Sequence, residues 1–172
     1  KAPRITDRLK HEADGAGYLD PGFTHIFVIP ADGGAPRQLT SGDYNHGSSL
    51  SWSPDSATIY FSANRNEDWE YDFRNSEVYA VRARTGIISA LTESPGPDRS
   101  PMVSPDGKKI AFMGYVDKVQ TYQTSKLHLM NLDGSSMQTI SEGLDRSISN
   151  AVWASDSKGL YVQYNDLGLT KI

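Results

Sequence analysis

The sequence of 172 residues contains no cysteine, and this absence removes several kinds of chemistry. Without thiols the chain has no disulfide bond, no thiolate nucleophile and no thiolate-ligated metal. Chains without cysteine are tolerated in oxidising and reducing surroundings alike, so the absence says nothing about the compartment.

Long apolar runs and an excess of positive charge are also lacking. No stretch approaches the roughly 20 consecutive apolar residues of a membrane helix, and the polar start of the chain, residues 1–4, is unlike a signal peptide. The 17 basic and 21 acidic residues give a formal net charge of −4, which argues against a surface that binds nucleic acid or an anionic membrane. We therefore expect neither nucleic acid nor a membrane as a partner.

Motifs for catalysis, metals and cofactors are missing as well. No two of the 15 glycines stand four residues apart, so the Gly-x-Ser-x-Gly nucleophile motif is absent. The four histidines show no His-x-x-x-His spacing, and His25 and His128, in or beside apolar strands, are expected to be structural. Gly15-x-Gly17 begins a dinucleotide-binding pattern, but Asp20 stands at its last glycine position. The sequence predicts no catalytic residue, no cofactor and no metal site.

The strongest positive signal is an internal repeat. Three segments share an apolar strand, a turn of the Ser-Pro-Asp type and a second strand, and each is marked by one aspartate: Asp55, Asp106 and Asp156. The spacings of 51 and 50 residues are close to the period of about 40 to 50 residues that is typical of four-stranded propeller blades. Proline presets the second position of a type I turn, and the fourth position favours glycine.

A second element repeats in the same phase. An apolar strand precedes a glycine turn and a short strand at three places, residues 26–40, 78–92 and 127–141. Each unit therefore predicts four antiparallel strands, and no segment keeps the 3.6-residue periodicity of a helix. The predicted fold is all-β, a partial β-propeller of four-stranded antiparallel blades with a WD-like repeat.

The repeat also predicts blade boundaries. We expect blade parts in residues 1–40, blades at about 43–92 and 97–141, and a truncated blade at about 149–172. Propellers close with about 4 to 8 blades, so we expect the chain to be a piece of a longer protein whose open strand edges favour self-association.

Three matching repeat positions carry Trp52, Val103 and Trp153. A four-stranded blade has two apolar faces and stacks on its neighbours to bury them. Apolar residues that keep their place in a repeat usually serve packing. We therefore expect all three side chains to lie between blades.

The segment Arg8–Asp20, running into residues 24–29, resembles the propeller of prolyl-oligopeptidase-family serine peptidases, most of all the acylaminoacyl-peptidase and dipeptidyl-aminopeptidase branch. Residues 36–44, the Ser-Pro-Asp units and residues 62–68 are similar to blades of the same family. The Ser-Pro-Asp repeat also occurs in the periplasmic propeller of the Tol system, so the Arg8–Asp20 segment is the more specific part of the resemblance.

The resemblance implies a two-domain enzyme. Its propeller would cap a C-terminal α/β-hydrolase domain of the same parent chain and restrict entry to short peptides. The catalytic serine, aspartate and histidine of such enzymes belong to the hydrolase domain, so none is carried over to this sequence. The family implies a cytoplasmic location, with the periplasm as the alternative.

One expected loop combines acidic and aromatic residues. It spans residues 64–74, and the candidates for contact with a peptide or with the hydrolase domain are Glu67, Asp68, Trp69, Glu70 and Tyr71. Long loops within a compact domain are often functional, and these carboxylates would pair with the free amino terminus of a peptide. The alternative is that the loop packs against a neighbouring loop or solvent.

Two other interpretations stay open. One is a stand-alone protein-binding propeller such as a Tol-like periplasmic module. The other is a propeller that acts on sugars through a metal in its central channel, which metal analysis of the purified chain would test. The sequence that follows Ile172 distinguishes the first of these from a peptidase propeller.

Overall fold

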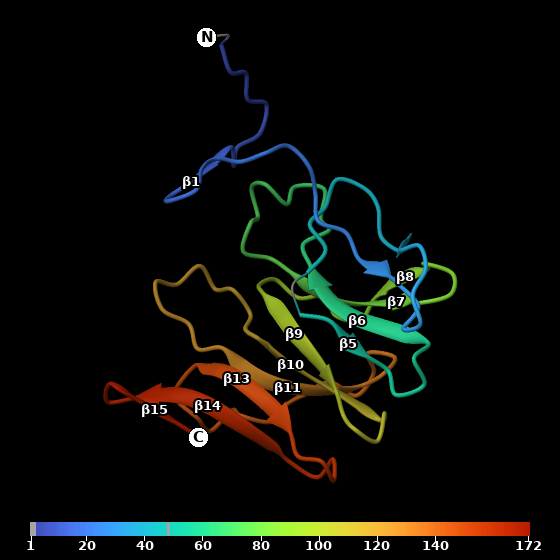
Figure 1. The fold of residues 1–172 in the computed structure, drawn as a ribbon. Coiled ribbons are helices and arrows are strands. Elements are labelled where there is room, and N and C mark those ends of the chain that lie inside the picture. Colours follow the sequence, from blue (N-terminus) through green and yellow to red (C-terminus); the bar gives the residue numbers. More distant parts are fainter. Residues whose placement is uncertain (1–2, 48) are drawn as a thin grey trace.

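The computed structural model describes residues 3–47 and 49–172, and over these residues every regular element is a strand (Figure 1). The strands, in chain order, are β1 Glu12–Ala13, β2 Gly17–Tyr18, β3 Phe27–Val28, β4 Arg37–Gln38, β5 Ser51–Trp52, β6 Thr58–Ala63, β7 Glu77–Arg82, β8 Ile88–Ala90, β9 Asp98–Val103, β10 Lys109–Gly114, β11 Lys126–Asn131, β12 Gln138–Thr139, β13 Ile148–Trp153, β14 Leu160–Asp166 and β15 Leu169–Lys171. Across these two ranges no helix is long and apolar enough to cross a membrane.

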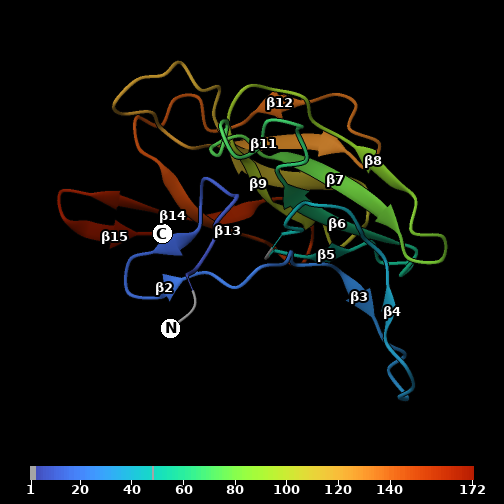
Figure 2. The same cartoon turned by 90° about the horizontal axis from the view of Figure 1, so that it is seen from above.

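The strands form five antiparallel sheets in which each strand lies beside its neighbour in sequence. Two sheets have four strands, β5-β6-β7-β8 and β9-β10-β11-β12, one has three, β13-β14-β15, and two are hairpins, β1-β2 and β3-β4. Figure 2 shows four of these sheets, all except β1-β2, following one another in chain order from β3-β4 to β13-β14-β15. The predicted all-β class with four-stranded antiparallel sheets is confirmed, whereas the division into blades of a longer propeller stays a prediction.

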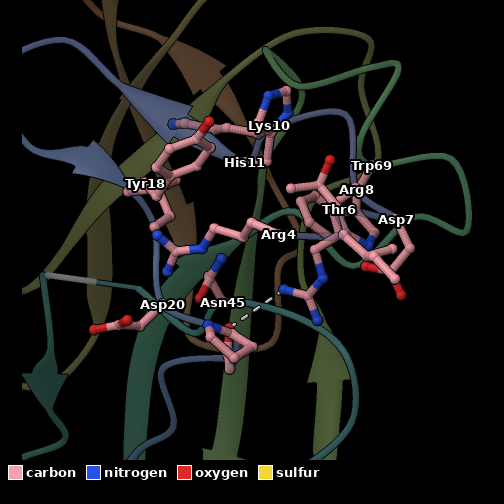
Figure 3. Close-up of a pocket in the computed structure, with 14 residues that line it drawn as sticks. Arg4, Thr6, Asp7, Arg8, Lys10, His11, Tyr18, Asp20, Asn45 and Trp69 are labelled. Atoms are coloured by element: carbon pink, nitrogen blue, oxygen red, sulfur yellow. Dashed lines mark hydrogen bonds between the residues drawn. The ribbon is translucent and has the colours of Figure 1, made fainter. Parts of the chain in front are cut away.

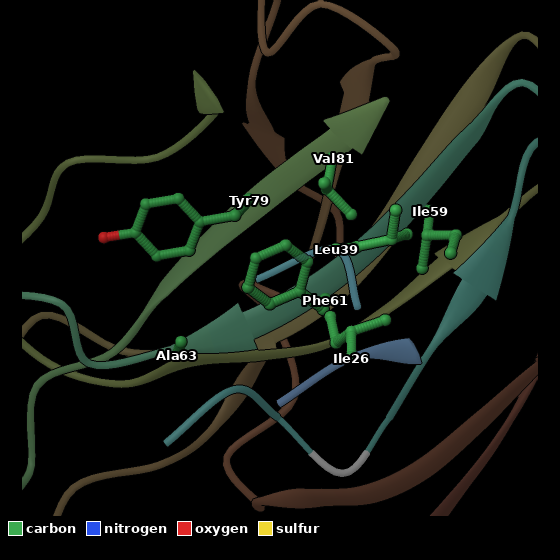
Figure 4. Close-up of a cluster of buried hydrophobic side chains, with 7 residues drawn as sticks. All are labelled: Ile26, Leu39, Ile59, Phe61, Ala63, Tyr79 and Val81. Atoms are coloured by element: carbon green, nitrogen blue, oxygen red, sulfur yellow. The ribbon is translucent and has the colours of Figure 1, made fainter. Parts of the chain in front are cut away.

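Consecutive sheets pack face to face because strand alternation gives each sheet two apolar faces. On β6, Phe61 joins the core between β3-β4 and β5–β8, and Tyr60 joins the next core. On β10, Phe112 faces back toward β5–β8 while Met113 faces β13–β15. Figure 4 shows the first core, made of Ile26, Leu39, Ile59, Phe61, Ala63, Tyr79 and Val81.

The Ser-Pro-Asp turns use one hydrogen-bond pattern twice. Ser53 Oγ donates to Asp55 Oδ1 at 2.5 Å and accepts the backbone N–H of Thr58 at 3.0 Å. Ser104 Oγ donates to Asp106 Oδ1 at 2.7 Å in the second unit. The serine bond lowers the pKa of both aspartates, which keeps the carboxylates charged and able to accept.

The residue after each of the three repeat aspartates, Asp55, Asp106 and Asp156, adopts the left-handed conformation. Its φ is 56° at Ser56, 69° at Gly107 and 61° at Ser157. Glycine takes this conformation without strain, and serine does not. Gly107 therefore adopts this conformation without strain, as the glycine at the fourth position of the Ser-Pro-Asp-Gly turn predicts.

A hydroxyl group ties the end of the fourth strand to the start of the third. In each unit its oxygen accepts a backbone N–H of the third strand at 2.8 to 2.9 Å: Thr40 from Ile26, Thr92 from Val78 and Ser141 from Leu127. The residues around these bonds lie at the end of the sheets where the long loops emerge.

The expected packing of the three repeat positions is wrong for Trp52, which is 46% exposed. Val103 lies partly buried against the second core, and Trp153 packs into the third core with Nε1 donating to the carbonyl of Met102 at 3.0 Å. Trp52 differs because the preceding sheet, β3-β4, has two strands in the described chain and no first strand to face the indole.

Candidate functional site at the loop end of the sheets

The loops that join second to third strands and the connections between sheets meet at one end of the molecule, here called the loop end. The N–H of Asp98 donates to the carbonyl of Ser76 at 2.7 Å, and Ser76 N donates to the carbonyl of Gly96 at 3.3 Å. The N–H of Asp117, in the β10–β11 loop, donates to the carbonyl of Pro95 at 2.7 Å. These bonds join the β6–β7 loop, the β8–β9 connection and the β10–β11 loop into one surface.

The predicted loop residues lie at this end and differ in how far their side chains are exposed. Glu67 and Asp68 are exposed, Trp69 and Glu70 are half-buried, and Tyr71 is 78% exposed. Backbone bonds fold the loop into tight turns, since Tyr71 N donates to the carbonyl of Asp68 at 2.8 Å. Glu70 Oε1 is buried without a hydrogen-bond partner among the described residues.

Of the five predicted loop residues, Trp69 lines a hollow whose other walls come from different segments of the chain. Its ring meets Phe23 edge to face, with 6.0 Å between the centroids. The hollow, of about 440 Å³, lies between Trp69, Asn45 and residues 4–22, and is called the arm hollow below (Figure 3). Trp69 also lines a second, more open hollow with Glu67 and Tyr44. Asp68, Glu70 and Tyr71 line neither of these two.

The segment that carries the family resemblance forms the wall of the arm hollow. Residues 8–20 fold into the hairpin β1-β2, closed by Leu19 N donating to the carbonyl of His11 at 2.9 Å. The tight turn uses Gly15 at a φ of 77° and Gly17 at 73°, a conformation that glycine adopts without strain. Figure 1 shows this hairpin, called the arm below, standing apart from the stacked sheets, on the side where the β6–β7 loop emerges.

A pair of histidines lies beneath the same loop. The Nδ1 atoms of His25 and His46 are 3.2 Å apart, and His46, 2% exposed, also has Nδ1 at 3.2 Å from the carbonyl of Thr24. Arg65, at the start of the loop, donates to His46 Nε2, so the ring is neutral and carries its proton on Nδ1. Burial lowers the pKa of His46, the bond to Thr24 partly opposes this shift, and the charge of Arg65 adds to it.

The matching position of the next unit holds two buried carboxyl groups instead. Glu77 accepts from the hydroxyl of Thr92 and from the N–H of Ser94, and Ser94 Oγ donates to Asp98 Oδ2 at 3.0 Å. Burial raises the pKa of both groups, and the charge of Asp98 raises that of Glu77 further. Gly114 leaves room for this pair, because a Cβ there would stand 2.1 Å from Asp98 Oδ1.

Sequence reasoning missed both pairs. His25 and His46 are 21 residues apart, as are Glu77 and Asp98, because each pair joins the start of a third strand to the start of the next sheet. The repeat itself was the signal that would have found them. Among residues 3–47 and 49–172, no group of three or more His, Cys, Asp or Glu side chains is placed to hold a metal ion.

The sheets have up to four antiparallel strands, each beside its chain neighbour, and they stack face to face, as the blades of a β-propeller do. The family model "Dipeptidyl peptidase IV (DPP IV) N-terminal region" matches residues 14–124, more than half of the chain. The chain belongs to this family. The resemblance to the propeller of prolyl-oligopeptidase-family peptidases is thereby confirmed.

A curated relative agrees with this assignment, and two solved structures share the fold. Dipeptidyl-peptidase 5 of Porphyromonas gingivalis is 28% identical over 114 residues, which is 65% of this chain and 17% of the relative. Among solved structures, puromycin hydrolase superposes with a TM-score of 0.65 at 17% identity, over 82% of this chain and 24% of that one. TolB from Acinetobacter baumannii gives a TM-score of 0.64 at 19% identity, over 84% and 33%. At these identities, the structural matches show the fold alone.

Proposed function

We propose that this chain is the propeller part of a serine peptidase that acts on short peptides, and that it gates their access to an α/β-hydrolase domain of the same parent protein. The observation that carries the proposal is the match of residues 14–124 to the dipeptidyl peptidase IV N-terminal region. The chain spans 17% of the length of the P. gingivalis dipeptidyl-peptidase, which leaves room in such a parent for a catalytic domain.

The loop end supports a role in contacts with another domain. Large apolar side chains are exposed on both of its long loops, Tyr71 and Phe73 on one and Val119 and Tyr122 on the other. Exposed apolar groups that gather on one surface mark interaction sites. Stacked sheets joined by continuous cores hold these loops in place, which suits a filter that passes peptides by size.

The carboxylates of the β6–β7 loop are proposed to meet the peptide's free amino terminus. Glu67, Asp68 and Glu70 form no ion pair within the part of the chain that the structure describes. A charge-assisted contact to an ammonium group contributes about 1.5–3 kcal/mol. Such a contact would distinguish peptides with a free amino terminus from acetylated ones.

The test uses the full-length parent enzyme with Glu67→Gln, Asp68→Asn and Glu70→Gln combined. We expect KM for peptides with a free amino terminus to rise about tenfold or more, while KM for acetylated peptides stays constant. Asp32→Asn, an exposed change in the β3–β4 turn, is the matched control. Equal KM values for the triple variant and the unchanged enzyme would remove the loop from substrate binding.

The second candidate is a stand-alone binding propeller, and the fold shared with TolB is compatible with it. In that case the exposed side chains of the loop end would bind a partner protein. A parent reading frame that closes the propeller without a hydrolase domain would support this candidate.

A further inference from the structure

The arm hollow contains charged groups of both signs that do not pair with each other. Three basic side chains and two acidic ones line it: Arg4, Arg8, Lys10, Asp7 and Asp20. Within residues 3–47 and 49–172, none of these five takes part in an ion pair. Opposite charges that share a hollow without pairing are available to a ligand.

Aromatic rings hold the two guanidinium groups in position. The guanidinium carbon of Arg4 lies 4.6 Å from the centroid of Tyr18, and that of Arg8 lies 4.3 Å from the centroid of Phe23. Figure 3 shows Arg4 extended beneath the Tyr18 ring. A stacked guanidinium keeps the N–H donors on its edge, and their planar fork matches the two oxygens of a carboxylate.

The remaining walls supply neutral contacts. The Oδ1 atom of Asn45 accepts from the backbone N–H of Thr24 at 3.0 Å and from its hydroxyl at 3.2 Å, so the amide nitrogen of Asn45 is left to donate. The ring of Trp69, held edge to face by Phe23, adds an apolar wall. Amide donors and an apolar surface suit a peptide backbone with small side chains.

We propose that the arm hollow binds the C-terminal carboxylate of a short peptide. Arg4 and Arg8 receive the carboxylate, and Asp7 and Asp20 accept from the peptide's backbone N–H groups. A volume of about 440 Å³ lies within the range of roughly 300–1,000 Å³ that is usual for small-ligand sites.

Phosphorylated or polyanionic ligands fit this hollow less well. Asp7 and Asp20 stand among the basic groups, and the chain carries a formal net charge of −4. Both features repel a ligand with several negative charges. A single carboxylate at the end of an uncharged chain is the anion that the lining matches.

This site also assigns a function to the β1-β2 hairpin. The hairpin β1-β2 pairs with no other sheet in the described chain, yet it lies within the Arg8–Asp20 stretch that carries the family resemblance. The inference concerns this chain alone and needs no hydrolase domain. Its failure would therefore leave the proposed function standing, and the reverse also holds.

Isothermal titration calorimetry of the 172-residue chain tests the proposal. The probes are acetyl-trialanine with a free carboxylate and the same peptide with a C-terminal amide. We expect the acid to bind at least about tenfold more tightly than the amide, because only the acid makes charge-assisted bonds to the guanidinium groups. We expect Arg8→Gln to weaken binding of the acid by a similar factor.

Arg84→Gln is the matched control, since Arg84 is exposed and lies in the β7–β8 turn, outside the arm hollow. Thermal melting of each variant shows whether the sheets remain folded. The proposal fails if acid and amide bind equally, if neither binds, or if Arg8→Gln binds the acid as tightly as Arg84→Gln. It also fails if acetyl-Ala-Glu-Ala-amide binds as tightly as the acid, because the hollow would then accept any carboxylate.

Discussion

His25 and His46 face each other with 3.2 Å between their Nδ1 atoms, and Arg65 approaches the far nitrogen of His46. The guanidinium of Arg65 also lies over the rings of Tyr44 and Tyr79, at 4.9 and 5.8 Å from their centroids. This contact fixes the start of the β6–β7 loop only while the imidazole of His46 is neutral, because a protonated ring would repel the guanidinium.

The first prediction concerns the pH dependence of this contact. The folded chain holds the pKa of His46 below its ordinary value of 6.5, so the unfolded chain binds more protons as the pH falls through 6.5. The contribution of His46 to the free energy of unfolding should therefore decrease as the pH falls from 7 to 5. Chemical denaturation at several pH values measures this change.

The matched variants for that measurement are His46→Gln and His11→Gln. His46→Gln removes the titrating ring and should flatten the decrease between pH 7 and pH 5. His11→Gln, in the arm, should keep the slope of the unchanged chain. Identical slopes for all three proteins would contradict the role assigned to His46.

The second prediction concerns Asp98, where the sign is opposite. Burial raises its pKa above the ordinary value of 3.8, so its contribution to stability is present at low pH and is lost as the pH rises through the folded pKa. Asp98→Asn keeps an oxygen to accept from Ser94 and removes the charge. We expect the variant to be more stable than the unchanged chain at pH 7, with the difference fading toward pH 3.5.

Thermal melts at pH 7 and pH 3.5 test this expectation. Asp156→Asn serves as control, because Asp156 is exposed in a turn. A lower melting temperature for Asp98→Asn at pH 7 would show that the ionised carboxylate stabilises the fold, contrary to the expectation.

The third prediction concerns the close approach of Gly114 to the Asp98 segment. A Cβ at Gly114 would stand 2.1 Å from Asp98 Oδ1 and 2.7 Å from the carbonyl of Pro97. Because backbone lies on that side, we expect Gly114→Ala to lower the free energy of unfolding by about 1–3 kcal/mol. Gly159→Ala is the control, since nothing lies within 4 Å of a Cβ there, and equal losses in urea denaturation would refute the steric account.

The fourth prediction contrasts two tryptophans at matching repeat positions. Trp153→Phe removes the bond from Nε1 to the carbonyl of Met102 and part of a side chain that packs against the third core, at a loss of about 1–3 kcal/mol. Trp52→Phe changes a side chain that is 46% exposed and should cost less than about 0.5 kcal/mol. Urea denaturation of both variants measures the difference, and equal losses would contradict the packing described here.

The fold class could be predicted from sequence because its signals are local and repeated. Asp55 and Asp106 mark turns whose serine, proline and following residue each fit one backbone conformation. Trp52 is an exception, since a repeat position predicts burial only where the neighbouring sheet supplies the facing strand.

The site was less predictable because its parts come from distant segments. The sequence points to Trp69 in the loop, but its partner Phe23 and the arm hollow depend on the path of residues 4–22. The pairing of Glu77 with Asp98 likewise depends on how one sheet follows the next. The composition of the loop contained no information about either contact.

The most direct test of the central claim is the sequence of the parent reading frame beyond the codon for Ile172. We expect further blades followed by a Gly-x-Ser-x-Gly motif between a strand and a helix, the nucleophile turn of an α/β-hydrolase domain. A reading frame that closes the propeller and ends without that motif would contradict the peptidase assignment and leave a binding propeller.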